Sequence, residues 1–92
     1  MAPVIYRYEV PIDDQWHEIS LQGKILPTLG SRKPFKVEFW ALADDSDDIG
    51  IPRSFRVFGT GYPLPSGTTP EMLHGSVIGG GGMYVWHLVE RR

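Results

Sequence analysis

Apolar and polar residues alternate with a period of two along much of the chain, and prolines and glycines separate the alternating runs. The run 4–10 places Val and Tyr at every second position, with Ile, Arg and Glu between them. The runs 35–42, 54–59 and 83–90 alternate in the same way. Because successive side chains of a strand point to opposite faces of its sheet, this pattern predicts two-faced β-strands.

Two shorter runs, 16–21 and 24–26, flank Gln22-Gly23 and predict a hairpin. One helix of one to two turns is expected over 69–74, because Thr68 and Glu71 have capping-box spacing and Gly75 follows. We therefore predict one mainly β domain over residues 1–92. It is an antiparallel sheet, a sandwich or a partly open barrel of about six strands with one short helix.

Composition restricts the classes of function. A length of 92 residues accommodates one hydrophobic core, and a net charge of −2 provides no global basic field for double-stranded nucleic acid. Cysteine is absent, which excludes disulfides and thiolate chemistry. No apolar run approaches the roughly 20 residues of a membrane span, and residues 1–4 lack a signal-peptide pattern. We expect a cytoplasmic protein that binds neither a duplex nor a membrane.

The acidic loop, residues 44–48, holds four of the 11 acidic residues. A calcium loop is the functional interpretation, but aligning Gly50 with the EF-hand glycine puts Ile49 at a ligand position and Arg56 where a glutamate belongs. The three histidines also lack the spacing of zinc ligands. We therefore predict a solvated loop between two strands and no metal site.

Four consecutive glycines, residues 79–82, suggest a loop whose N–H groups surround an anion. Phosphate-binding fingerprints require a helix after the glycines, whereas residues 83–86 read as a strand. The favoured interpretation is a flexible turn before the last strand. A second interpretation is a tip that becomes ordered around a ligand.

The histidines give little support for catalysis. His17 follows Asp13 closely enough for a general-base pair, but no nucleophile motif accompanies it. His87 alternates with apolar residues, which indicates a hydrogen-bonded, partly buried side chain. We expect a protein without catalytic residues or cofactors, and a hydrolase that uses His17 or His87 is the least favoured alternative.

Aromatic and arginine residues share the predicted strands. Arg7 and Glu9 fall on one face, as do Glu38 and Trp40, so neighbouring strands would form a cross-strand charge ladder beside an aromatic ring. The alternative is a binding surface in which aromatic rings stack a base and arginines meet phosphate. The residues that would form such a ligand site are Tyr6, Arg7, Tyr8, Trp16, His17, Trp40, Arg56 and Tyr62, with Gly80 and Gly81 in a lid.

Four segments together resemble a known family: residues 6–19, 37–42, 55–61 with 63–65, and 85–90. They are similar to small proteins, largely without assigned function, of actinobacteria and their bacteriophages. The resemblance implies an actinobacterial or phage origin but no mechanism. By analogy with other small phage proteins that lack enzymatic motifs, we expect a non-enzymatic accessory protein that neutralises a host component. We expect it to sequester a small anionic, nucleotide-like immune signal, as an anti-defence protein, and to form a homo-oligomer. The alternative is a protein–protein inhibitor or adaptor that presents the acidic loop to a basic host protein.

Overall fold

Strands dominate the regular structure of the chain. The computed structural model describes residues 2–44 and 50–91. The strands are β1 (Pro3–Pro11), β2 (His17–Leu21), β3 (Lys24–Gly30), β4 (Lys36–Asp44), β5 (Ile51–Gly59), β6 (Leu73–Gly79) and β7 (Tyr84–Arg91). Two 3-10 turns, η1 (Pro70–Met72) and η2 (Gly80–Gly82), flank β6. The prediction of a mainly β, antiparallel fold is confirmed, with seven strands in place of about six.

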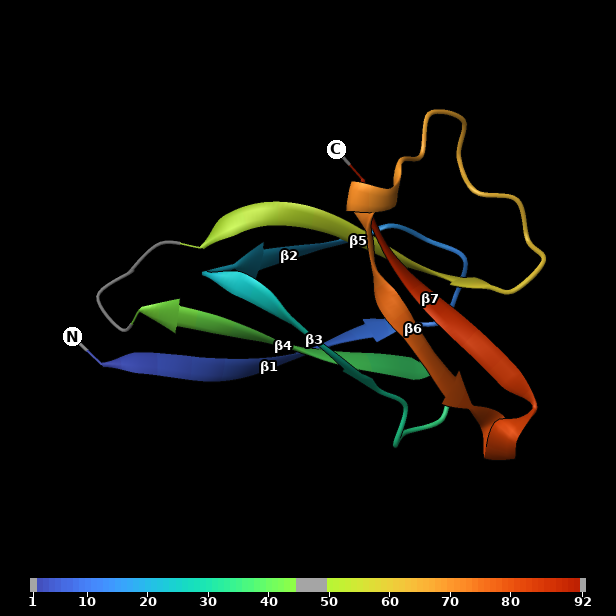
Figure 1. The fold of residues 1–92 in the computed structure, drawn as a ribbon, viewed down its shortest axis with the longest axis horizontal. Helices are drawn as coiled ribbons and strands as arrows, with labels where there is room; N and C mark the ends of the chain where they lie inside the picture. Colours follow the sequence, from blue (N-terminus) through green and yellow to red (C-terminus); the bar gives the residue numbers. More distant parts are fainter. Residues whose placement is uncertain (1, 45–49, 92) are drawn as a thin grey trace.

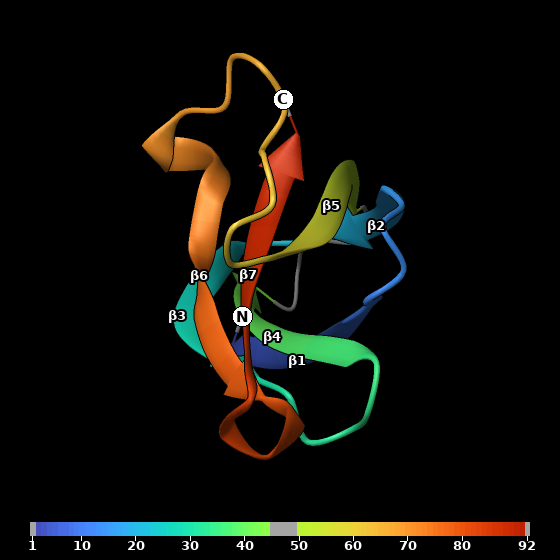
Figure 2. The ribbon, with the colours of Figure 1, turned by 90° about the vertical axis from the view of Figure 1, so that its right-hand side faces the viewer.

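The strands form two antiparallel sheets that pack face to face. The first has the order β1-β4-β3, and the second has the order β2-β5-β7-β6. Figure 1 shows β6 and β7 running obliquely to β1 and β4, and Figure 2 shows the two sheets from the side. Of the predicted architectures, the structure is the sandwich, and its two sheets do not close into a barrel.

The inner faces of the two sheets supply the core. β4 contributes Val37, Phe39 and Ala41, and β5 contributes Phe55 and Val57, all of them buried. The Phe39 and Phe55 rings meet across the sandwich with their centroids 5.1 Å apart. These residues occupy alternate positions, so the predicted two-faced pattern of β4 and β5 is confirmed.

The predicted hairpin around Gln22-Gly23 is wrong. β2 pairs with β5 and β3 pairs with β4, so the chain passes from one sheet to the other at this point. Gly23 has a φ of +81°, and a Cβ there would overlap the Leu42 carbonyl oxygen. Only glycine combines a left-handed backbone with this close approach, so Gly23 makes a corner between the sheets.

The segment before β6 is less helical than the sequence indicates. A single 3-10 turn forms over Pro70–Met72, and β6 begins immediately at Leu73. The Thr68 hydroxyl donates to the Pro65 carbonyl at 2.6 Å and closes a turn, so it does not cap a helix. The sequence does not predict β6 itself, because its two glycines and short apolar run lack clear alternation.

Candidate functional site

The residues predicted to bind a ligand lie on separate surfaces. Arg7 and Trp40 are cross-strand partners on the outer face of the β1-β4-β3 sheet. Tyr8 points inward and stacks on Phe39, with 5.3 Å between the ring centroids, so it packs against the core. Tyr6 is exposed on β1. The structure therefore does not gather the four strand residues into one pocket.

The remaining predicted residues are spread over the second sheet and its connections. Trp16 and Arg56 both pack on Phe58, the indole at 6.1 Å between centroids and the guanidinium carbon 4.4 Å from the ring centroid. His17 lies at the start of β2, and Tyr62 is exposed in the loop after β5. Gly80 and Gly81 lie apart from these residues, in the turn between β6 and β7.

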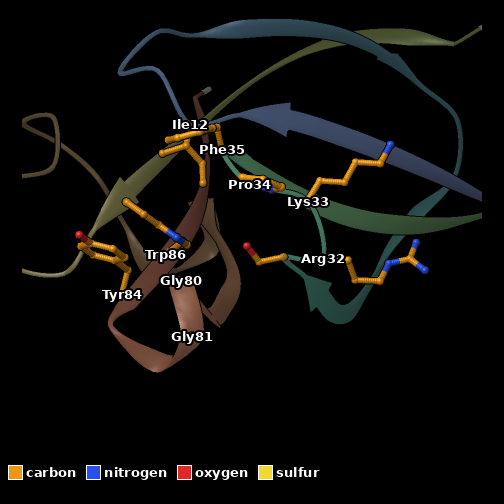
Figure 3. A pocket seen from close by; sticks show the side chains of 10 residues that line it. Ile12, Arg32, Lys33, Pro34, Phe35, Gly80, Gly81, Tyr84 and Trp86 are labelled. Carbon is orange, nitrogen blue, oxygen red and sulfur yellow. The ribbon is translucent and has the colours of Figure 1, made fainter.

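A groove with a volume of about 790 Å³ opens where this glycine turn faces the loop between β3 and β4. We call it the end groove (Figure 3). Its lining residues are Ile12, Ser31, Arg32, Lys33, Pro34, Phe35, Gly80, Gly81, Tyr84 and Trp86. The four-glycine segment is thus a turn before the last strand, as predicted, and two of its glycines line a groove.

Aromatic side chains form one wall of the end groove. Tyr84 and Trp86 are stacked, with 5.5 Å between centroids and 25° between the ring planes. Phe35 is 78% exposed and has a φ of +64°, a conformation that residues other than glycine rarely adopt. The Phe35 carbonyl accepts a 2.7 Å hydrogen bond from the Ile12 N–H. The loop therefore presents an apolar ring to solvent beside the stacked pair.

Glycine is required where the turn meets this wall. Gly80, Gly81 and Gly82 all have positive φ angles, and a Cβ on Gly80 would meet the Tyr84 ring. The turn closes with a 3.3 Å hydrogen bond from the Met83 N–H to the Gly80 carbonyl. A run of left-handed glycines can turn its free N–H groups toward a bound anion.

Arg32 and Lys33 contribute to the opposite wall, but their charged ends point away from Trp86 (Figure 3). Arg32 donates two hydrogen bonds to Glu38, at 2.9 and 2.7 Å. Lys33 Nζ lies 3.0 Å from a carboxylate oxygen of Glu9. Both cations therefore leave the groove and join the outer face of the β1-β4-β3 sheet.

That outer face carries the charge ladder that the strand pattern predicts, and the ladder is confirmed. Four cations surround Glu9 and Glu38, and we call them the basic face: Arg7, Arg32, Lys33 and Lys36. Hydrogen bonds from Arg32, opposed by burial and assisted by Arg7, lower the pKa of Glu38 to about 2. The hydrogen bond from Lys33 likewise lowers the pKa of Glu9.

His87 lies at a second hollow, of about 280 Å³, on the outer face of the other sheet. The Ser76 hydroxyl is 2.6 Å from Nδ1, and the Thr60 hydroxyl is 2.7 Å from Nε2. Thr60 also donates to the Val85 carbonyl, which favours Nε2–H as donor to Thr60 and Ser76 as donor to Nδ1. The prediction of a hydrogen-bonded, partly buried His87 is confirmed. Neither partner is the carboxylate that orients the histidine of a hydrolase triad.

Two further polar contacts involve histidine. His17 Nε2 lies 2.8 Å from Asp13, as the sequence suggests, and this hydrogen bond lowers the pKa of Asp13. His74 Nε2 lies 2.7 Å from Glu90, which also pairs with Arg53. Within residues 2–44 and 50–91, no three His, Cys, Asp or Glu side chains are arranged to hold a metal ion.

Of the residues that line the end groove, only Gly80 and Gly81 are among the site residues predicted from the sequence. The segment Ser31-Arg32-Lys33-Pro34-Phe35 carries a usable signal, since two cations precede a proline and an aromatic between two strands. The alternating pattern identifies Tyr84 and Trp86 only as strand residues. Their approach to residues 31–35 depends on how the two sheets pack, and no local pattern encodes that.

A family model described as "Domain of unknown function (DUF7352)" matches residues 1–92. No curated protein and no solved structure matches the chain. Among the described residues, none of the helical segments is long and apolar enough to cross a membrane.

Proposed function

This chain belongs to the DUF7352 family, and we propose that it binds a small anionic ligand with a planar ring, such as a nucleotide, in the end groove. The supporting observation is that one groove is lined by a stacked Tyr84–Trp86 pair, a glycine turn and a loop whose two cations extend from the groove onto the adjoining sheet face. Rings bind planar bases by stacking, while N–H groups and cations bind phosphate. The protein binds this ligand without converting it chemically, so the ligand that dissociates is unchanged.

Lys33 is the cation that can turn toward the ligand at the lower cost. Its partner Glu9 is mostly hidden but also lies close to Arg7 and Lys36, so Glu9 keeps cations beside it when Lys33 turns away. Arg32 forms a two-pronged pair with Glu38, whose side chain is fully buried. Moving the Arg32 side chain would remove two charge-assisted hydrogen bonds from that buried carboxylate, so Arg32 stays in place.

The origin and the biological role are part of the proposal. The resemblance of the sequence segments supports an actinobacterial or phage origin, and we propose with it a role in sequestering a host immune signal. The alternative, an inhibitor that uses the acidic loop, rests on residues 44–48, of which the structure describes only Asp44. The proposed ligand site has the fuller structural support, because its lining residues are all described.

The test uses deoxyadenosine monophosphate as the probe. Titration of labelled protein should shift the indole N–H signal of Trp86 and the amide signal of Gly81, and leave the indole signal of Trp16 unchanged. Lys33→Ala should weaken binding about tenfold, the equivalent of one charge-assisted contact. Deoxyadenosine, which lacks the phosphate, should bind both proteins equally weakly.

Tyr84→Ala tests the aromatic wall, and Tyr62→Ala is its matched control because both tyrosines are exposed. Loss of binding in the first variant alone supports the end groove. Equal binding by both variants, or signal shifts confined to residues outside the end groove, would overturn the proposed site.

A further inference from the structure

The cations of the basic face remain accessible although they are paired. Their side chains are 41% exposed at Arg7, 71% at Arg32, 53% at Lys33 and 45% at Lys36. The two carboxylates they surround are mostly hidden, Glu38 completely. Four cations against two carboxylates leave a surplus of positive charge on the side that faces solvent.

The end groove and the basic face are continuous. Arg32 and Lys33 belong to both, because their chain segment lines the groove while their charged ends reach Glu38 and Glu9. Figure 3 shows both side chains extending from the groove on the side opposite Tyr84 and Trp86. Lys36 begins β4 directly after this segment, so the positive charge continues from the groove onto the sheet.

The basic face also carries a half-buried aromatic ring, in addition to Trp86 in the end groove. Trp40 is the cross-strand partner of Arg7, and its ring approaches Gly30 so closely that a Cβ there would lie 3.3 Å from it. Aromatic rings thus lie at the end groove and on the basic face, with cations between them. Alternating aromatic and basic groups are typical of surfaces that bind single-stranded nucleic acid.

We infer that the end groove and the basic face together bind one single-stranded nucleic acid, with a base in the groove and the backbone crossing Lys33 onto the basic face. This inference rests on the proposed function and extends it from a mononucleotide to a strand. The phosphate of a mononucleotide reaches only Lys33, since Arg32 stays on Glu38 and Arg7 and Lys36 lie outside the groove. The later phosphates of a strand reach Arg7 and Lys36.

A duplex fits this surface less well. Its bases are stacked on one another and cannot enter the aromatic groove, and the protein as a whole is acidic. An acidic peptide would use the cations but leave the aromatic wall without a partner. The single strand is the ligand that uses both parts of the surface.

The experiment compares deoxyadenosine monophosphate with a labelled single strand of about ten of the same nucleotides, a length within the usual site sizes. We expect the strand to bind at least tenfold more tightly. We also expect the logarithm of its association constant to fall with the logarithm of salt concentration with a slope of about −2, as for three phosphate contacts.

Lys36→Ala tests the basic face, because Lys36 lies outside the end groove and its Nζ is 4.0 Å from Glu9. This variant should weaken strand binding several-fold, reduce the salt slope by about 0.7, and leave mononucleotide binding unchanged. Lys24→Ala is the matched control, because Lys24 lies opposite Leu42 at the other end of β4. Circular dichroism establishes that both variants are folded.

The outcomes separate this inference from the proposed function. Equal affinity for mononucleotide and strand, or a strand affinity that Lys36→Ala leaves unchanged, overturns the inference and leaves the ligand site intact. An affinity for a duplex equal to that for the single strand also overturns it. So does displacement of the strand by poly-glutamate, if Tyr84→Ala leaves the affinity for the strand unchanged. Absence of binding to every nucleotide probe overturns both proposals.

Discussion

Glu38 has the most demanding environment of the described carboxylates, because its side chain is fully buried on the outer face of a sheet. A carboxylate in that position is stable only if donors surround it. Arg7 and Arg32 provide them, and Gly30 leaves room beside it, since a Cβ there would lie 3.3 Å from a Glu38 oxygen. An ionic cluster therefore stabilises the outer face of the β1-β4-β3 sheet.

Acid should weaken the fold through Glu38. Its pKa falls from 4.5 to about 2 on folding, so its contribution to stability is fully present above pH 4.5 and is lost as pH falls toward 2. Glu38→Gln should lower the melting temperature by roughly 10 °C at pH 7 and flatten the acid dependence. Thermal melts between pH 7 and pH 2 measure both effects. An unchanged acid dependence in the variant would contradict this role.

Gly23 should be intolerant of any side chain. Gly23→Ala must accept both a left-handed backbone and an overlap with the Leu42 carbonyl, and we expect loss of the folded protein. Gly67 provides a matched control, because its φ is +87° and a Cβ there would have no other atom within 4 Å. Gly67→Ala should cost only about 1–2 kcal/mol, the backbone penalty alone. Urea denaturation distinguishes the two, and similar losses would show that the overlap is unimportant.

At the scale of elements, a buried polar cluster joins three strands of the larger sheet. Glu90 on β7 pairs with Arg53 on β5 at 2.6 Å and with His74 on β6 at 2.7 Å. Burial pushes the pKa of Glu90 upward, but the hydrogen bonds from Arg53 and His74 outweigh it and leave that pKa below its ordinary value. This cluster therefore contributes stability that is lost in acid.

Replacing Glu90 should loosen the contacts among these strands. Glu90→Gln leaves Arg53 without a counter-charge and should cost about 1–3 kcal/mol of unfolding free energy. Glu18→Gln, on the exposed side of β2, is the control and should be neutral. Urea denaturation at pH 7 measures both. A neutral Glu90→Gln variant would mean that solvent satisfies Arg53.

At the scale of the whole molecule, apolar side chains remain exposed at the β6–β7 end. Ile78 and Val85 are cross-strand partners, and Ile78 and Met83 are 66% and 79% exposed. Exposed apolar groups beside an edge strand favour association with a second copy. They alternate with Tyr84, so association there leaves the end groove on the other side of β7.

We therefore expect a homodimer in solution. Light scattering after size exclusion should give twice the monomer mass of 10.4 kDa, and Ile78→Lys should give the monomer. The same charge change at Ile51→Lys is a control, since Ile51 is equally exposed but lies on β5. A stable monomer in the unsubstituted protein would contradict the prediction.

The local sequence pattern is enough to place most of the β-strands and the polarity of their faces. Alternation identified β1, β4, β5 and β7 and placed Phe39 and Phe55 inside, because side-chain direction along a strand depends only on neighbouring residues. The charge ladder followed from the same parity once β1 and β4 were paired. β6 is not predicted from the sequence, because its glycines interrupt the alternation of apolar and polar residues.

Strand pairing and the contacts at the ends of the sandwich depend on long-range packing. The segments 16–21 and 24–26 suit a hairpin locally, yet they pair with β5 and β4 in different sheets, and Gly23 permits the corner between them. The end groove arises in the same way, from residues 31–35 and 80–86 that are distant in sequence. The packing of the two sheets places its aromatic wall beside the loop that carries the cations. The alternation of residues along a single strand does not predict this long-range contact.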